Sequence, residues 1–322
     1  MAHNQEARSK KRVLCSYGVD LDAVSIWANT SNGAVTNPTD VSRGIGATVG
    51  VDRLLSLFDR NKIRATWFIP AHTLESFPKQ VAKIRDSGHE MYTHSKTGKY
   101  STMLTLPSSG LHGYTHERVG DLTAVQERDV FDKSIKTLTS FTGKKPKSWT
   151  APSWKTSLRT VELLGENGIE YDHSFMHHDS QMYYLPYTPS VTETNLQRSA
   201  TDWMKPMSTI RPSSIVEIPA NWHLDDWPAL NVGPGGSGFV DPDVLERLWK
   251  SQFDFYYREY DTFVFPITIH PQVSGKPHAM LMHERLISYI NEHEGVEWCI
   301  MKDIATEFRR FPGHVVDGGV DS

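Results

Sequence analysis

Short apolar runs alternate with longer amphipathic segments along most of the chain. Residues 13–19 (VLCSYGV) and 262–269 (TFVFPITI) are apolar over the length of a buried strand, whereas 51–61 and 242–260 repeat apolar residues at helical spacing. Buried strands that alternate with helices are typical of parallel sheets. About seven or eight such pairs, with short connections, predict an α/β fold and a single-domain distorted (β/α) barrel of about seven strands rather than an open sheet.

The length supports one domain. A chain of 322 residues, 38% of them hydrophobic, can bury a large core, and barrels of this size are commonly single domains. We expect a flexible N-terminal tail at 1–12 and a barrel over 13–311 that carries an unusual insertion at 92–109. A C-terminal tail is expected at 312–322.

The insertion separates two pieces that otherwise form one strand and the loop after it. GHEM precedes it and GLHGYTHE follows it, while the segment itself is rich in Ser and Thr, lacks acidic residues and shows no period. One interpretation is a loop or lid over a functional site. As a lid, the segment would either displace the residues that follow it or bulge outward and leave them in place.

The alternative interpretation is a retained short intron of a eukaryotic gene. Met91 requires ATG and Tyr92 begins with TA, so the message contains GTA, the start of a common intron donor. An AGY codon for Ser109 would supply the acceptor, and removal of the intervening nucleotides would restore GHEIGLHGYTHE. Genomic DNA without such a donor and acceptor pair would exclude this hypothesis.

Charge and segment composition restrict the partners. The formal net charge of −4 offers no basic field for phosphate backbones, which argues against nucleic acid and favours a small-molecule substrate. No segment approaches the ~20 uninterrupted apolar residues of a membrane span. The N-terminal segment also lacks the apolar core of a signal peptide, so we expect no membrane association and a cytoplasmic location.

Two further features are consistent with a cytosolic globular protein. Cys15 and Cys299 lie in apolar strand-like runs, which favours buried free thiols in the core over a disulfide. The aromatic and Met-rich segments 253–260 and 279–286 suit helix faces packed on the barrel, or alternatively the interface of a homo-oligomer.

Carboxylates and histidines follow two of the predicted strands. Asp20 and Asp22 alternate in an extended segment and so share one face, while the i, i+4 spacing of His112 and His116 would stack both rings on a helical turn. The carboxyl ends of barrel strands meet at one mouth. Two imidazoles and a carboxylate there make a three-ligand site with a position open for water, as in catalytic zinc sites.

Other rigid or polar groups follow the remaining strands. Pro152 and Trp154 come after KSWTA, and His270 comes after FVFPITI. His72 lies in IPAHTLE, where it would either line the pocket or cap the next helix. His177 and His178 could bind metal, but a solvated loop is favoured. Neither His89 nor His94 is expected to be a ligand.

With these motifs the chain resembles the polysaccharide deacetylase (NodB-homology) superfamily, carbohydrate esterase family four. The resemblance is carried by residues 18–22 (GVDLD), 112–116 (HGYTH), 151–154 (APSW), 269–271 (IHP) and 275–277 (GKP). It is most similar to the intracellular branch that contains cyclic imide hydrolases, allantoinase-like enzymes and a bacterial peptidoglycan deacetylase. Such chains also carry segments like TWFIPAHTLESFP and EIPANWHLDDWP.

The resemblance implies roles for the strand-end residues. Asp22, His112 and His116 would bind a divalent metal, most consistent with Zn, although a site of two His and one Asp also accepts Co, Mn or Ni. Asp20 would be the general base and His270 the general acid of a metal-activated hydrolysis of a C–N bond.

The same resemblance implies a substrate pocket. Either Asp225 or Asp226 would orient His270, and an aromatic residue beside them would form a pocket wall. The expected pocket residues are His72, Pro152, Trp154, Trp222, Asp226 and Trp227.

Two departures from the family pattern bear on the substrate. Polysaccharide-active members usually have adjacent aspartates and an Arg before the proline, whereas Leu21 intervenes here and Ala151 precedes Pro152. The sequence therefore favours a cytosolic hydrolase of a small amide, cyclic imide or ureide. The alternatives are a chitin-type or peptidoglycan-type N-deacetylase and a catalytically silent binding protein on the same fold.

Overall fold

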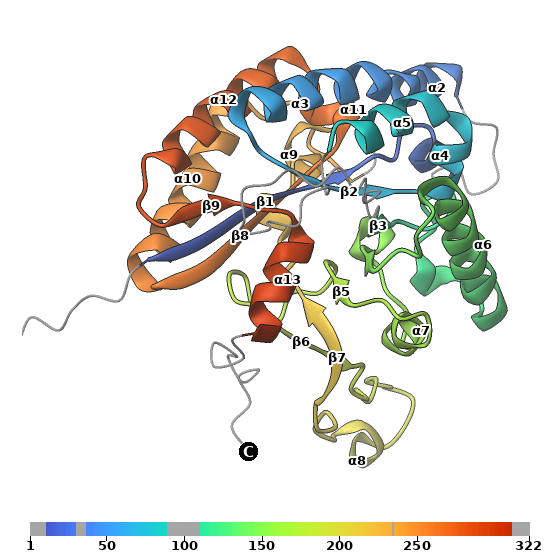
Figure 1. Ribbon diagram of the computed structural model, residues 1–322. Coiled ribbons are helices and arrows are strands. Elements are labelled where there is room, and N and C mark those ends of the chain that lie inside the picture. Colours follow the sequence, from blue (N-terminus) through green and yellow to red (C-terminus); the bar gives the residue numbers. More distant parts are fainter. Residues whose placement is uncertain (1–10, 30–36, 89–109, 234, 311–322) are drawn as a thin grey trace, which may run out of the picture.

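One curled sheet organises the computed structural model, which describes residues 11–29, 37–88, 110–233 and 235–310 (Figure 1). Both predicted tails and the insertion at 92–109 lie largely or wholly outside these ranges, and so do His89 and His94. The strands are β1 (Arg12–Asp20), β2 (Thr66–Ile69), β3 (Gly110–Leu111), β4 (Ser148–Trp149), β5 (Tyr171–Asp172), β6 (Tyr183–Tyr187), β7 (Arg211–Glu217), β8 (Thr262–Ile269) and β9 (Val296–Trp298).

The strand order is that of a distorted barrel. Its path is β6-β7-β5-β4-β3-β2-β1-β8, and β9 pairs with the first half of β1 before β2 pairs with the second half. Among the described strands, every pair is parallel except β6 with β7. The predicted fold class is therefore confirmed. The strand count exceeds the expected seven because β6 adds an antiparallel strand at one end of the path and β9 pairs with β1 off the path.

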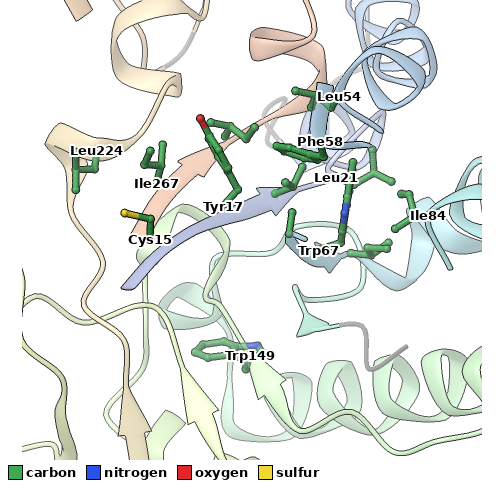
Figure 2. Close-up of a cluster of buried hydrophobic side chains, with 14 of the residues drawn as sticks. Cys15, Tyr17, Leu21, Leu54, Phe58, Trp67, Ile84, Trp149, Leu224 and Ile267 are labelled. Carbon is green, nitrogen blue, oxygen red and sulfur yellow. The ribbon is translucent and has the colours of Figure 1, made fainter. Parts of the chain in front are cut away.

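Most of the helices cover the outer side of the sheet, where the larger core lies (Figure 1). Figure 2 shows Tyr17 of β1 among these side chains, beside Leu54 and Phe58 of the helix layer. The helices of more than one turn are α2 (Pro38–Ile45), α3 (Ala47–Asn61), α4 (Ala71–Ser76), α5 (Pro78–Asp86), α6 (Ala124–Thr142), α7 (Thr160–Glu166), α10 (Pro242–Glu259), α12 (Pro277–Asn291) and α13 (Met301–Arg310). Short helical turns are α1 (Ser25–Asn29), α8 (Ala200–Trp203), α9 (Trp227–Leu230) and α11 (Pro271–Ser274).

The inner side of the sheet has a second, smaller core. Side chains from β1, β2, β5, β7 and β8 pack there against α13, whose inward face includes Met301, Ile304 and Phe308. In Figure 1, α13 crosses the concave side of the sheet, opposite the main helix layer. A methyl group on Gly18 would lie 2.9 Å from the side chain of Met301, so the interior is filled at this level.

Several smaller expectations can be compared with this structure. Cys15 and Cys299 are buried free thiols, as predicted. The inward faces of α10 and α12 are buried in the core, including Phe253 and Leu286, in agreement with the packing interpretation of those segments. Over the described residues, no helix is both long and apolar enough to cross a membrane.

Candidate active site

Two aspartates stand at the end of β1, one residue apart. Asp20 is the last residue of β1, Leu21 turns into the outer core, and Asp22 is fully buried. The backbone of Asp22 is held because its carbonyl accepts hydrogen bonds from Ser25 N and from Thr73 Oγ1, the latter at 2.6 Å. The two carboxylates therefore enter the same mouth, as their spacing predicts.

The loop after β3 holds His112 and His116 in a tight turn rather than in the predicted helical turn. Gly113 and His116 both have left-handed backbones, with φ of 68° and 62°. The carboxylate of Glu117 accepts hydrogen bonds from the backbone N–H groups of Tyr114 and Thr115, and these bonds close the turn without helical ones. The result still brings the two imidazoles together, with ring centroids 4.9 Å apart.

The start of α4 supports this turn. Ala71 N donates to Gly113 O and His72 N to Tyr114 O, so that two N–H groups that α4 leaves unpaired fix the loop. The side chain of His72 lies 3.0 Å from Ser25 Oγ, where it neither lines the cavity nor caps the helix. His72 therefore contacts Ser25 and not the cavity that the other expected pocket residues surround.

Asp22, His112 and His116 offer a set of metal ligands. Asp22 Oδ1 lies 3.2 Å from His112 Nε2 and 3.7 Å from His116 Nε2, and the three ligand atoms all lie within 4.8 Å of one another. His112 Nδ1 lies 2.9 Å from the carbonyl of Thr150 and must donate to it, which leaves a lone pair on Nε2.

This arrangement fits a divalent cation. Neither Asp22 Oδ1 nor His112 Nε2 has a hydrogen-bond partner among the described residues, although both atoms are buried. Two acceptors that face each other at this distance repel unless a proton or a cation lies between them. Two imidazole nitrogens and one carboxylate oxygen are the ligand types of catalytic zinc sites.

Burial and nearby charges shift the pKa values of these groups in different directions. Burial would raise the pKa of Asp22, but His116, His112 and His270 outweigh burial and hold the pKa of Asp22 well below its usual range. Burial also lowers the pKa of His116 to about 4, in spite of the nearby Asp22, so that this imidazole is neutral and available as a ligand near pH 7. Burial raises the pKa of Asp20 to about 6.

His270 faces the same point from the end of β8. Its Nε2 atom lies 3.7 Å from Asp22 Oδ2 and 4.0 Å from Asp20 Oδ2. Asp226 holds the other side of the ring, because its Oδ1 lies 2.7 Å from His270 Nδ1 and its Oδ2 accepts from His270 N at 3.0 Å. Burial lowers the pKa of His270, but Asp226 outweighs it and raises the pKa well above its usual range.

The two adjacent aspartates that the sequence could not separate have different partners. Asp226 makes the hydrogen bonds to His270, whereas Asp225 Oδ1 accepts from Trp227 N and lies 3.7 Å from His270 Nδ1. Together with His270 they form a second cluster with metal-ligand chemistry. The oxygens of Asp226 and His270 Nδ1 are already engaged in hydrogen bonds, so this cluster supports His270 instead of offering open ligands.

A cavity of about 670 Å³ opens above these groups. Ser153 and Trp154 both have left-handed backbones. The ring centroid of Trp154 lies 4.5 Å from that of Trp222. Backbone strain of this kind is concentrated at functional sites. The lining residues that matter for chemistry and recognition are Asp20, His116, Asp225, His270, Trp27, Trp154, Trp222, Trp227, Arg118 and Lys155.

Two more expected pocket residues do not line the cavity. Pro152 is buried, and Asp226 is fully buried and hydrogen-bonded to His270. Sequence reasoning also missed Trp27, which approaches Trp227 to 6.2 Å between ring centroids, and Gln272, whose Nε2 donates to Asp22 Oδ2 at 3.3 Å. For Gln272 the available signal was its place two residues after His270.

His177 and His178 do not line the cavity. His178 Nδ1 accepts from three successive backbone N–H groups, those of residues 179–181, while His177 packs edge-on against Tyr183. Both residues belong to the segment between β5 and β6. These contacts are those of a structural loop, in agreement with the favoured interpretation.

A glycine contact holds the segment that follows His270. A methyl group on Gly50 of α3 would lie 2.0 Å from the carbonyl oxygen of Pro271. We expect Gly50→Ala to push α3 away from α11 and to cost about 1–3 kcal/mol of unfolding free energy, even though Ala favours helices over Gly by ~1 kcal/mol. Displacement of His270 should also lower kcat.

Urea unfolding and steady-state kinetics of Gly50→Ala measure both effects. The matched control is Gly165→Ala in α7, because a methyl group there meets no atom within 4 Å. This control should be neutral or more stable than the parent. Equal stabilities of the two variants would contradict the expected steric conflict.

Comparison with known proteins supports a family assignment. Residues 44–171 match the family described as polysaccharide deacetylase. The chain is 43% identical, over 302 residues, to a peptidoglycan deacetylase of Helicobacter pylori, a match that covers 92% of this chain and 97% of that protein. It is 36% identical, over 316 residues, to the peptidoglycan deacetylase-like protein FGM2 of Gibberella zeae, covering 94% and 88%.

The fold has a solved counterpart. The crystal structure of Puue allantoinase superposes with a TM-score of 0.70 over 94% of this chain and 92% of that one, at 22% sequence identity. At this level of identity the likeness concerns the fold alone.

Proposed function

Since the chain belongs to the polysaccharide deacetylase family, we propose that it is a metal-dependent hydrolase that removes the acetyl group from an N-acetylated amino sugar. One observation carries the proposal. The ligand atoms of Asp22, His112 and His116 lie within 4.8 Å of one another, and His116 lines the cavity together with Asp20 and His270. This is the set of groups that amide hydrolysis by activated water requires.

Asp22, His112 and His116 would hold the metal. A divalent ion bound there would polarise the amide carbonyl and would lower the pKa of its bound water to ~7. The two imidazoles and the carboxylate suit zinc, while cobalt, manganese and nickel also accept such ligands. Thr150 orients His112 and Gln272 orients Asp22, so both ligands are fixed by hydrogen bonds before an ion arrives.

Asp20 is suited to act as the general base. Its Oδ2 atom lies 3.7 Å from His112 Nε2 and 4.0 Å from His270 Nε2, so the carboxylate borders the proposed metal position. Burial raises its pKa to about 6, which gives a stronger base than an exposed aspartate and leaves it mostly ionised at pH 7.

His270 is suited to act as the general acid. Its Nε2 atom faces the metal position, and the charge of Asp226 stabilises the protonated ring. The departing amine needs a proton, because an amide anion is a poor leaving group. Asp20 and His270 therefore approach the scissile bond as base and acid, and neither role uses a group that binds the metal.

The walls of the cavity suit a sugar ring. Four tryptophans, namely Trp27, Trp154, Trp222 and Trp227, line it together with Arg118 and Lys155. Aromatic faces pack against the apolar faces of pyranose rings, and the polar groups at the rim are available for hydroxyls. The relatives named above as peptidoglycan deacetylases support the same substrate class.

A small cyclic amide, imide or ureide is the second candidate substrate. Asp20 Oδ1 is buried with no hydrogen-bond partner among the described residues, and Ala151 stands where the family resemblance implies an Arg in polysaccharide-active members. In the absence of that Arg, His112 and His270 are the groups that lower the pKa of Asp20 against the effect of burial. Four tryptophans also enclose a compact planar ring well.

The proposed location is the cytosol. Cys15 and Cys299 are both buried without a disulfide, and Cys299 Sγ lies 3.8 Å from the carbonyl oxygen of Cys15. Burial raises the pKa of the Cys15 thiol, which keeps it protonated and unreactive. Such thiols suit a reducing compartment.

Mass spectrometry of reaction products tests the substrate. Zinc-loaded protein is incubated with short N-acetylglucosamine oligomers and, separately, with cyclic imides, and Asp20→Asn serves as the blank. We expect the oligomers to lose acetyl groups and to release acetate. An imide that gains water, with intact oligomers, would replace the proposal by the second candidate. No change in either substrate would favour a silent binding protein.

A further inference from the structure

Behind His270, a chain of buried hydrogen bonds continues through the molecule as far as β1. Asp226 Oδ2 lies 2.5 Å from Ser274 Oγ at the end of α11, and Ser274 Oγ lies 2.8 Å from His283 Nε2 in α12. His283 Nδ1 lies 3.2 Å from the hydroxyl of Tyr17. Ser274, His283 and Tyr17 are each fully buried.

The donor and acceptor of each link can be assigned. The carboxylate of Asp226 only accepts, so the Ser274 hydroxyl must donate to it. Ser274 Oγ is then free to accept, and His283 Nε2–H is the donor that reaches it. A neutral imidazole carries one proton, so His283 Nδ1 accepts from the Tyr17 hydroxyl. In every hydrogen bond of the chain, the donor is therefore the residue farther from Asp226.

Burial keeps this chain in its assigned state. It lowers the pKa of His283 to about 4, although Asp226 acts in the opposite direction, so the ring is neutral near pH 7. Burial also raises the pKa of Tyr17 well above its usual range, and the phenol keeps its proton. Because no link can easily gain or lose a proton, the orientation of the chain persists across the working pH range.

We propose that Ser274 and His283 are positioning residues that hold the carboxylate of Asp226 in place and thereby aim His270 Nε2 at the reacting amide nitrogen. This inference rests on the proposed function of His270 as the general acid. Among the described residues, the other hydrogen bonds to the Asp226 carboxylate come from the backbone and ring of His270, so a carboxylate without Ser274 could turn about its side-chain bonds. Catalytic groups need second partners of this kind to keep their geometry.

The position of His283 argues against mere space filling. The centroid of its ring lies 5.6 Å from that of Tyr17 and 5.8 Å from that of Trp249. The surrounding layer between β1 and the helices is otherwise apolar. Figure 2 shows the Tyr17 hydroxyl pointing away from β1 toward that layer. A buried polar ring is costly in such surroundings unless its hydrogen bonds are made. Leucine would fill the same space at no such cost.

Four single variants and one double variant test the proposal. Ser274→Ala and His283→Leu break the chain, whereas His283→Gln keeps an N–H donor near Nε2 and an acceptor for Tyr17. Tyr17→Phe removes only the outermost link. Near-UV circular dichroism and metal content of each variant establish that it is folded and loaded, and His283→Gln remains as a probe if His283→Leu does not fold.

The first readout needs no substrate. The proton of His270 Nδ1 in its hydrogen bond with Asp226 should give a low-field NMR resonance in the parent protein. We expect this resonance to shift or disappear in Ser274→Ala and His283→Leu and to persist in His283→Gln. An unchanged resonance in both chain-breaking variants would overturn the proposal, whatever substrate the protein hydrolyses.

The second readout is a double-mutant cycle on kcat with whichever substrate is hydrolysed. Ser274→Ala and His283→Leu should each lower kcat about tenfold or more, the scale seen for outer-shell partners, with KM unchanged and with recovery in His283→Gln. If His283 acts through Ser274, the double variant should be no slower than Ser274→Ala. Multiplied effects would overturn the proposal. A parent protein inactive on every substrate would refute only the proposed function.

Discussion

Asp20→Asn is expected to lower kcat by about 10²–10⁴, the usual contribution of a general base, while the protein keeps its full metal content. Asn has the shape of Asp but cannot take the proton of water. Asp20 is not one of the proposed ligands, which are Asp22, His112 and His116. Kinetics on the hydrolysed substrate and metal analysis of the same sample measure the two quantities.

The control for this variant is Asp52→Asn, which removes a carboxylate of the same kind from the exposed face of α3. Asp52 pairs there with Lys83, and such surface pairs contribute little. Its kcat should equal that of the parent. A kcat of Asp20→Asn within threefold of the parent would refute the assignment of Asp20 as the base and would direct attention to Asp225, the other acid that lines the cavity.

Asp22→Asn is expected to lower metal affinity at least 10–100-fold, the range reported even for outer-shell partners of a ligand, and to abolish activity with it. Asp22 Oδ1 is the carboxylate oxygen nearest to both imidazoles, so it supplies the negative charge that would attract the cation. Metal titration followed by fluorescence or calorimetry measures the affinity. Chelation of the parent protein should likewise remove activity, and zinc should restore it.

Stability separates this result from simple unfolding. Because the three histidines hold the pKa of Asp22 below its usual range, its charge stabilises the metal-free protein, so metal-free Asp22→Asn should unfold cooperatively but be less stable than the metal-free parent at pH 7. The parent should gain thermal stability on adding zinc, and the variant should not. If zinc stabilised both proteins equally, the ion would have to bind elsewhere.

The elements that the sequence predicted well are those with local signals. Continuous apolar runs marked β1 and β8, and strand ends placed Asp20, Asp22 and His270 at one mouth. This succeeds because the carboxyl ends of parallel strands meet by topology, whatever the details of packing. The inference required no knowledge of the loops.

The elements that it missed depend on contacts between distant segments. The turn from His112 to His116 is not helical, and the start of α4 fixes it, because Ala71 N and His72 N donate to the carbonyls of Gly113 and Tyr114. The choice between Asp225 and Asp226 depends on how α9 begins. Trp27 reaches the cavity only because α1 packs beside Trp227.

The same distinction applies to the supporting chain. Nothing in the local pattern around Ser274 or His283 distinguishes them from ordinary helix residues, because their partners come from α9, α11, α12 and β1. Only the folded arrangement brings these groups within hydrogen-bond distance. Positioning residues of this type are therefore harder to find from a single sequence than the groups that contact the substrate.

The pairing of β1 has a consequence for how the protein folds. Nearly the whole of β1 pairs with β8, from Arg12 with Thr262 to Val19 with Ile269, and its first half also pairs with β9. Only its last residues, Gly18–Asp20, pair with the early strand β2, so an emerging chain must pass residue 262 before most of β1 finds its neighbours. Such non-local pairing slows folding and leaves an unpaired edge exposed during synthesis. Shortening the chain before Val296 should therefore yield insoluble protein rather than a smaller folded enzyme.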